Sequence, residues 1–160
     1  MIRKGKKEDI ESIHKLDRES TKYHKKFDKE FYTISENFWK KKKYSQIKAI
    51  KSPTNLILVA ELNEKIVGYI WGYVQTIMKD KIGKIQELIV TSKHRKKGIG
   101  GELTQKMLEF FKREGCIYSE IEVFVENKPT VKFYEKIGFK KRLYKMQLNL
   151  SKTKKFRPFY

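Results

Sequence analysis

The chain has 160 residues and a formal net charge of +19, because 38 lysine and arginine residues oppose 19 acidic ones. Its 39% hydrophobic content, with ten Phe and nine Tyr, suffices for a folded core and excludes a disordered chain. A single cysteine, Cys116, excludes an internal disulfide framework and a cysteine-based zinc site. No apolar run reaches the roughly 20 residues that a membrane span requires. We therefore expect one domain over residues 1–150, a basic and aromatic tail over residues 151–160, and a cytoplasmic location.

The first half of the chain predicts a short strand, two helices and a β-hairpin. Residues 1–4 form the strand, and residues 8–25 carry Ile10, Ile13 and Leu16 at helical spacing. Ser35 is expected to cap a second helix with an apolar inner side made of Phe38, Trp39, Ile47 and Ile50. The lysines at 40–43 are interpreted as a solvated face of that helix, with a nucleic-acid patch as the alternative. Two β-rich runs at 55–62 and 65–78 are expected to join through a turn at 62–65.

The second half predicts strands alternating with helices. Residues 82–91 form a strand, and residues 98–113 form a helix that Gly115 ends. A fifth strand at 117–125, a short helix at 128–137 that Gly138 ends, and a last strand at 139–150 follow. Because a full helix connects the strands at 82–91 and 117–125, these two strands are expected to be parallel neighbours. The fold class is therefore α/β, with a mixed sheet and helices on its faces.

The segment from Ile85 to Leu103 has the layout of a phosphate-binding loop. An apolar strand ends at Val90, a basic turn follows, and glycines open an amphipathic helix. Free N–H groups at a helix start bind anions, and glycine lets the backbone approach phosphate oxygens closely. The residues expected to hold a pyrophosphate are Arg95, Lys96, Lys97, Gly98, Ile99, Gly100 and Gly101.

Two motifs resemble those of the GNAT family of N-acetyltransferases. Residues 95–100 fit its Arg/Gln-x-x-Gly-x-Gly/Ala signature, placed after an apolar strand. Asn127, followed by a helix that ends in Phe-Tyr-Glu-Lys-Ile-Gly-Phe at 133–139, fits its second signature. Pro129 and Thr130 depart from the usual pattern, which puts the geometry on the acceptor side in doubt. The resemblance extends over nearly the whole chain in the order of its elements.

The resemblance implies a largely antiparallel sheet with a splayed parallel strand pair at its centre and about four flanking helices. It implies acetyl-CoA as the donor, a primary amine as the acceptor, and direct attack in a ternary complex. No metal site is expected, because His14, His24 and His94 show no ligand spacing. The backbone of Leu88, Ile89 and Val90 would pair with the pantetheine arm, and the amide of Ile89 or Val90 would face the thioester oxygen. In the same scheme Asn127 hydrogen-bonds the cofactor and Tyr134 protonates the leaving thiolate. Either Glu122 or Glu87 matches a position of the general base.

The sequence is compatible with more than one acceptor amine. A free α-amine needs about 1 kcal/mol to lose its proton at pH 7 and a lysine side chain about 4.6, which favours a protein or peptide N-terminus. A small-molecule amine is the second choice. A third hypothesis is an RNA- or ribosome-binding protein of the same fold with little turnover, suggested by the lysines at 40–43 and by the basic residues and aromatics of the tail at 152–160. A homodimer is compatible with all three.

Overall fold

The structure, a computed structural model, describes residues 1–27 and 35–148 in two units, Met1–Glu126 and Asn127–Tyr160. The expected tail at 151–160 lies outside the described residues. The first unit contains a five-stranded sheet in the order β1-β2-β3-β4-β5. Its strands are β1 (Ile2–Lys4), β2 (Asn55–Leu62), β3 (Lys65–Ile77), β4 (Asp80–Val90) and β5 (Tyr118–Ile121). Three pairings are antiparallel and the β4–β5 pairing is parallel, which confirms the predicted mixed sheet.

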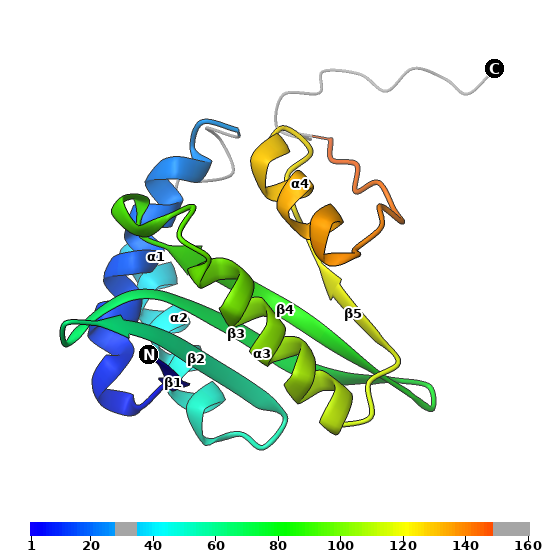
Figure 1. Cartoon of the computed structure of the whole chain (residues 1–160), viewed down its shortest axis with the longest axis horizontal. Coiled ribbons are helices and arrows are strands. Elements are labelled where there is room, and N and C mark those ends of the chain that lie inside the picture. The colour runs from blue at the N-terminus through cyan, green and yellow to red at the C-terminus, as the bar shows by residue number, and fades with distance from the viewer. Residues whose placement is uncertain (28–34, 149–160) are drawn as a thin grey trace. The chain divides into compact units, whose positions relative to one another are not determined.

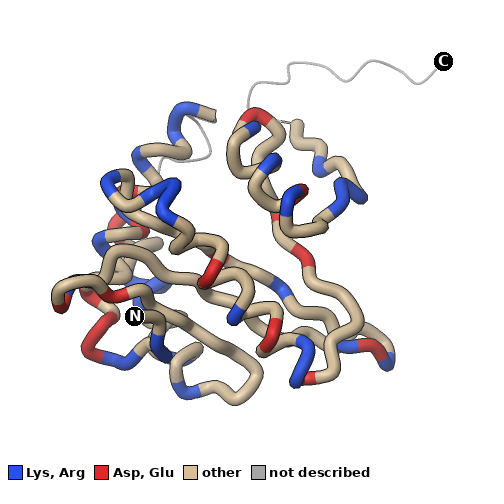
Figure 2. Tube along the Cα trace, viewed as in Figure 1, with Lys and Arg blue, Asp and Glu red and all other residues tan. Residues whose placement is uncertain are grey.

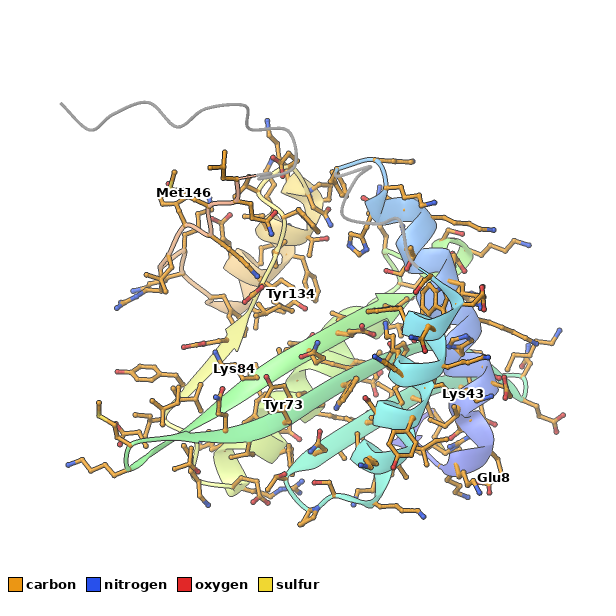
Figure 3. The ribbon with its side chains drawn as sticks, turned by 180° about the vertical axis from the view of Figure 1, so that it is seen from behind. Glu8, Lys43, Tyr73, Lys84, Tyr134 and Met146 are labelled. Carbon is orange, nitrogen blue, oxygen red and sulfur yellow. The ribbon has the colours of Figure 1, made fainter. Side chains whose placement is uncertain are left out.

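Helices cover both faces of this sheet. A single turn of 3-10 helix at Lys7–Asp9 leads into α1 (Ile10–His24), and α1 and α2 (Glu36–Lys51) lie on one face, while α3 (Ile99–Arg113) lies on the other (Figures 1 and 3). We call these the α1/α2 face and the α3 face. The core on the α1/α2 face contains Ile10, Ile13, Leu16, Ala49, Ile57, Val59, Tyr69 and Ile89. Within the described ranges, no helix combines the length and apolar character needed to cross a membrane.

Local sequence signals explain where several elements begin and end. The Ser35 hydroxyl accepts a hydrogen bond from the Phe38 amide and caps α2, as predicted. Asn63 and Glu64 both have positive φ in the β2–β3 turn, which suits the right-handed twist of a two-residue hairpin. Gly115, with a φ of 78°, ends α3 as predicted. Phe38 itself is 47% exposed, contrary to its predicted inner position, because it is one residue, or about 100° of rotation, away from buried Trp39.

Two glycines let α3 approach the sheet closely. A Cβ atom at Gly83 would lie 2.3 Å from Cγ of Phe111, and one at Gly72 would lie 2.6 Å from Sδ of Met107. Gly83 on β4 and Gly72 on β3 therefore face α3, and any larger residue would push the helix away. The packing of Phe111 and Met107 on these glycines fixes the position of α3 on the sheet.

A β-bulge in β4 changes which face its side chains occupy. Glu87 pairs with Trp71, whereas the next pair is Ile85 with Gly72, so Gln86 is an extra residue. Ile85 shares the α3 face with its partner Gly72, whereas Glu87 contacts Lys42 of α2 and the buried hydroxyl of Tyr69. Strict alternation would have placed Glu87 on the same face as Ile85. The bulge therefore turns Glu87 toward the α1/α2 face.

The fifth strand is shorter than predicted. It spans Tyr118–Ile121 instead of 117–125, because its pairing with β4 ends at Ile121. A strand persists only where its backbone groups find a neighbouring edge.

The second unit contains α4 (Lys128–Ile137), with Pro129 in its first turn and Gly138 at its end, as predicted. Residues 139–148 do not form the predicted last strand, and 149–150 lie outside the described residues. The apolar side chains of this segment, such as Leu143 and Met146, are exposed (Met146 is labelled in Figure 3). Alternating sequence alone does not make a strand, and the described part of this unit contains no other strand to pair with.

Candidate active site

The strand β4 has an open backbone edge next to the glycine-rich loop. Its pairing with β5 ends at Ile85 opposite Ile121, whereas β4 continues to Val90. The Thr91 amide donates to the Val67 carbonyl of β3 over 2.9 Å. Because backbone direction alternates along a strand, the amide of Ile89 also faces β3, and those of Leu88 and Val90 face the open edge. The pairing of the two parallel strands therefore ends at Ile85, before the last residues of β4.

The loop after β4 is fixed at its base by specific contacts. The Arg95 side chain donates from Nε to the Val90 carbonyl over 3.0 Å, and its guanidinium lies 4.9 Å from the centre of the Tyr23 ring. The Ser92 amide donates to Glu19 of α1 over 2.9 Å. Arg95 therefore holds the loop in place through these contacts. From the sequence alone it was expected to contribute to the binding of a pyrophosphate.

The start of α3 presents unpaired amides to open space. Gly98, with a φ of 84°, is the N-cap and has no side chain to cap the helix, and the first helical bond runs from the Glu102 amide to the Gly98 carbonyl. The amides of Ile99, Gly100 and Gly101 consequently have no acceptor within the helix. Nothing lies within 4 Å of a Cβ atom built on Gly98 or Gly101, and Lys96 and Lys97 are exposed. This arrangement suits an anionic group such as a pyrophosphate.

Glu87 belongs to a buried polar cluster on the α1/α2 face. Its carboxylate contacts the Tyr69 hydroxyl and lies 2.5 Å from Nζ of Lys42. The same hydroxyl and the same ammonium contact Asp17 of α1, and Gln46 of α2 donates to Asp17 over 2.8 Å. Asp17, Gln46 and Tyr69 are fully buried, and the Glu87 side chain is 20% exposed. Of the two carboxylates in this cluster, Glu87 is therefore the one that solvent can reach.

Burial raises the pKa of Glu87 from its ordinary value of 4.5 to about 7. The negative charge of Asp17 contributes in the same direction, whereas Lys42 lowers the pKa. A carboxylate with this proton affinity is suited to general-base chemistry at neutral pH.

The sequence alone did not place Asp17, Gln46 or Tyr69 beside Glu87, and it predicted a solvated position for Lys42. The lysines at 40–43 were predicted to be a solvated face, which holds for exposed Lys40 and Lys41. The Lys42 side chain is only 15% exposed, because it lies three residues after buried Trp39 and four before buried Gln46. This helical spacing from Trp39 is the feature of the sequence that indicates an inward position for Lys42.

The second predicted base lies elsewhere in the first unit. Glu122 is the residue after β5, and its side chain is exposed. It is not among the residues that contact Glu87 in the cluster. Lys and Arg residues occur along the described parts of both units (Figure 2). Across residues 1–27 and 35–148, no group of three or more His, Cys, Asp or Glu residues could hold a metal ion.

The second unit carries the other two predicted residues on α4. Tyr134 is buried, and its ring packs edge-on against Phe133 and Phe139, with centroids 4.9 and 5.3 Å away. Burial raises the pKa of Tyr134 well above its ordinary value, so its hydroxyl keeps its proton at neutral pH. Asn127 is the N-cap residue of α4, but its side chain makes no capping hydrogen bond. Its buried Oδ1 atom lacks a donor among the described residues, which leaves it available to a ligand.

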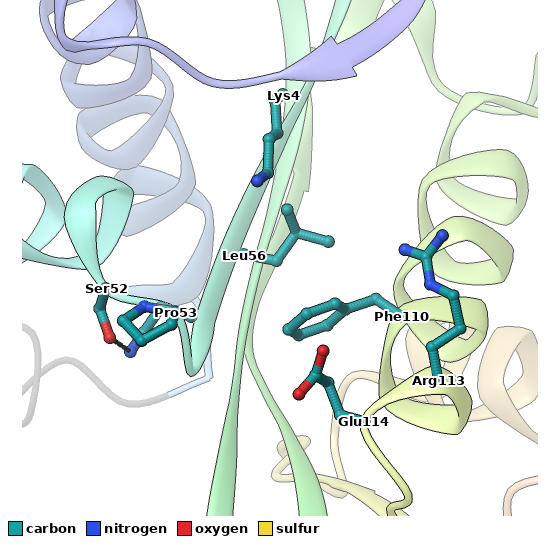
Figure 4. A pocket seen from close by; sticks show the side chains of 8 residues that line it. Lys4, Ser52, Pro53, Leu56, Phe110, Arg113 and Glu114 are labelled. Carbon is teal, nitrogen blue, oxygen red and sulfur yellow. Dashed lines mark hydrogen bonds between the residues drawn. The ribbon is translucent and has the colours of Figure 1, made fainter.

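A hollow of about 450 Å³ lies at the opposite end of α3 from the loop. Its lining includes Lys4, Leu56, Phe110, Arg113 and Glu114 (Figure 4). None of the residues predicted for the site lines it. It is therefore a separate feature from the open edge of β4.

Comparisons with known proteins agree with the motifs. The sequence pattern of the acetyltransferase (GNAT) family matches residues 10–139. An uncharacterized N-acetyltransferase of Methanocaldococcus jannaschii is 31% identical over 147 residues, covering 88% of this chain and 61% of the relative. An N-alpha-acetyltransferase of Sulfurisphaera tokodaii is 30% identical over 111 residues, covering 61% of this chain and 64% of the relative. The chain thus spans less than two thirds of these relatives.

The fold also matches solved structures. A Bacillus halodurans protein superposes with a TM-score of 0.83 at 22% identity, covering 94% of this chain and 99% of that protein. At this identity the likeness concerns the fold, and it supports the mixed sheet with helices on both faces.

Proposed function

We propose that this chain, which belongs to the acetyltransferase (GNAT) family, transfers an acetyl group from acetyl-CoA to a primary amine, with the α-amine of a protein or peptide as the preferred acceptor. The observation that carries the proposal is the open edge of β4. The strand pairs with β5 only as far as Ile85 and then runs on to Val90, beside a helix start with unpaired amides.

Acetyl-CoA fits the groups present. The amides of Ile99, Gly100 and Gly101, with exposed Lys96 and Lys97 nearby in the chain, would hold its pyrophosphate. The outward backbone groups of Leu88 and Val90 would pair with its amide-bearing arm as a neighbouring strand would. The unpaired Oδ1 of Asn127 would accept a further hydrogen bond from it. When bound, acetyl-CoA supplies an activated thioester carbonyl for attack.

The chain's own residues would move the protons. Glu87 is our preferred base, because its pKa of about 7 lets it accept a proton from the attacking amine, directly or through water. Glu122 remains the alternative. Tyr134, which keeps its proton at neutral pH, would donate it to the departing thiolate. The Val90 amide would stabilise negative charge on the carbonyl oxygen, an effect typically worth about 3 kcal/mol.

The preference for an α-amine rests on proton affinity and on relatives. A base with a pKa of about 7 is well matched to an α-amine, with a pKa near 8, and poorly matched to a lysine side chain, with a pKa near 10.4. The Sulfurisphaera tokodaii relative carries the name N-alpha-acetyltransferase. A small-molecule amine is the second candidate acceptor.

A competition between amines tests the proposal. The protein is mixed with acetyl-CoA and three acceptors: a peptide with a free N-terminus and no lysine, the same peptide blocked at its N-terminus with one lysine added, and a small amine. Mass spectrometry locates the acetyl group. We expect transfer to the free N-terminus. Preferred transfer to the small amine would contradict the acceptor assignment, and no transfer to any of the three would contradict the activity.

A further inference from the structure

A closed ring of polar contacts joins Glu87 to Asp17. The Tyr69 hydroxyl contacts Oδ1 of Asp17 and Oε2 of Glu87. On the other side, Nζ of Lys42 lies 3.1 Å from Oδ1 of Asp17 and 2.5 Å from Oε1 of Glu87. One phenol and one ammonium therefore each bridge two carboxyl groups that come from different elements of the fold.

The number of protons in this ring decides its charge. A phenol has one O–H, so Tyr69 can donate to only one of the two carboxylates. If both are ionised, the other carboxylate faces the phenol oxygen without a proton between them. If one carboxyl is protonated, it donates to the phenol oxygen while the phenol donates to the other, and both contacts are hydrogen bonds. The ring is therefore best satisfied when the carboxyl pair holds one proton.

The surroundings assign that proton to Glu87. Gln46 donates to Oδ2 of Asp17 over 2.8 Å, while Tyr69 and Lys42 contact Oδ1, so both oxygens of Asp17 already face donors. Glu87 has no such additional donor among the described residues and is the carboxyl that solvent can reach. A proton entering the ring thus arrives at Glu87.

We propose that Asp17 and Tyr69 are positioning residues that prepare Glu87 to take up the proton of the acceptor amine. The inference rests on the proposed function. In the step, an N–H bond of the ammonium breaks and an O–H bond forms on Glu87. The new O–H donates to the Tyr69 oxygen, the Tyr69 O–H donates to Asp17, and no other bond changes.

The charges around Glu87 agree with this assignment. Within the described residues, its titratable hydrogen-bond and ion-pair neighbours are Asp17 from α1, Lys42 from α2 and Tyr69 from β3. Burial and Asp17 raise the pKa of Glu87, and Lys42 opposes them. Burial also raises the pKa of Tyr69 well above its ordinary value, so the phenol stays protonated and able to donate.

Two variants with opposite expected effects test the ring. The Glu87 carboxyl is titrated by ¹³C NMR without acetyl-CoA, and its signal is assigned with Glu87→Gln. Asp17→Asn removes a negative neighbour and should lower the pKa of Glu87 by about one unit or more, whereas Lys42→Met removes a positive neighbour and should raise it. A general loss of structure in the two variants would not shift the pKa of Glu87 in opposite directions. If Asp17→Asn fails to fold, the upward shift in Lys42→Met decides alone.

The matched control is Glu11→Gln, which removes a different ion pair between α1 and α2, that of Glu11 with Lys43, and should leave the titration unchanged. A Glu87 pKa within about 0.3 unit of wild type in a folded Asp17→Asn or Lys42→Met variant would overturn the proposal. The acid limb of the pH–rate profile must move with the NMR value, and a limb that stays in place would overturn the positioning role. A protein that titrates as expected but acetylates no amine would contradict the proposed function and support the ring.

Discussion

Ile85 on β4 and Ile121 on β5 form the last residue pair between the two parallel strands, although β4 runs on to Val90. The bulge at Gln86, in the pairing of β4 with β3, follows immediately and turns Glu87 to the α1/α2 face. The open edge of β4 and the turned side chain of Glu87 therefore begin at the same point of the strand.

Gly83→Ala should destabilise the protein by about 1–3 kcal/mol, because its methyl group would overlap the Phe111 ring. Urea unfolding measures the loss, and adding Phe111→Leu should recover part of it. Gly115→Ala serves as the control. It strains a positive φ without a contact within 4 Å, so Phe111→Leu should not rescue it. Equal rescue of both variants would contradict the close packing of α3 on Gly83.

Gly101→Ala should make the protein more stable and the binding of coenzyme A weaker. The residue lies in the first turn of α3 with open space around it, and alanine is favoured over glycine in a helix by about 0.5–1 kcal/mol. The added methyl would occupy space next to the unpaired amides, and we expect about a tenfold rise in Kd by calorimetry. Gln105→Ala, an exposed change further along α3, should not alter Kd. Unchanged affinity in Gly101→Ala would argue against this binding position.

Asn127→Ala should weaken binding of coenzyme A with little effect on folding. Its buried Oδ1 lacks a donor among the described residues, so its removal should change the free energy of unfolding by less than about 1 kcal/mol. Asn55→Ala is the matched comparison, because that side chain accepts from Trp71 over 3.0 Å. We expect Asn55→Ala to lose stability and keep affinity. The reverse pattern would show that Asn127 is only structural.

Glu87→Gln should lower kcat/KM by about 10²–10⁴-fold and remove the acid limb of the pH–rate profile. With a pKa of about 7, wild-type Glu87 is active as a base only after it deprotonates, so activity should rise as the pH passes through that value. Glu122→Gln is the rival variant. A large loss there, with Glu87→Gln nearly unaffected, would transfer the role of base to Glu122.

Deprotonation of Glu87 should increase activity but decrease the stability of the folded state. Because its folded pKa of about 7 exceeds the ordinary 4.5, the folded state holds this proton more tightly than the unfolded chain. The contribution of Glu87 to stability is therefore full at low pH and is lost as the pH rises toward and through 7. Urea unfolding at about pH 5 and pH 8 should show a smaller decline in Glu87→Gln than in wild type. Parallel declines would indicate an ordinary pKa.

Tyr134→Phe should reduce turnover by about 10²-fold or more while leaving the affinity for coenzyme A nearly unchanged, since only the proton donor is lost. Tyr144→Phe, at an exposed tyrosine of the same unit, is the control and should retain full turnover. Rate and binding are measured separately, by release of free thiol and by calorimetry. Equal turnover in both variants would exclude Tyr134 as the proton donor.

The sequence predicted those parts of the fold that depend on local signals. The Ser35 cap, the turn at Asn63 and Glu64, and the glycines that end α3 and α4 each act within a few residues of themselves. Hydrophobic spacing located the helices and most strands for the same reason. The strand predicted at 139–150 does not form over its described part, 139–148, because pairing depends on a neighbour elsewhere in the chain.

The same distinction between local and long-range signals applies to the candidate site. The glycine-rich helix start is a local motif and was found, whereas the cluster around Glu87 joins three helical residues to two strand residues far apart in sequence. Helical spacing from Trp39 could have marked Lys42 and Gln46 as inward, and Asp17 adjoins buried Leu16. The bulge at Gln86 has no comparable signal, because alternation of apolar residues alone would have placed Glu87 on the opposite face.

The most direct test of the binding site is an amide NMR titration of the protein with coenzyme A. We expect the largest shift changes at the outward amides of Leu88 and Val90 and at those of Ile99, Gly100 and Gly101, with Gly83 and the Figure 4 hollow unaffected. A folded protein that shows no changes, or changes confined to residues around Phe110 and Arg113, would contradict the account.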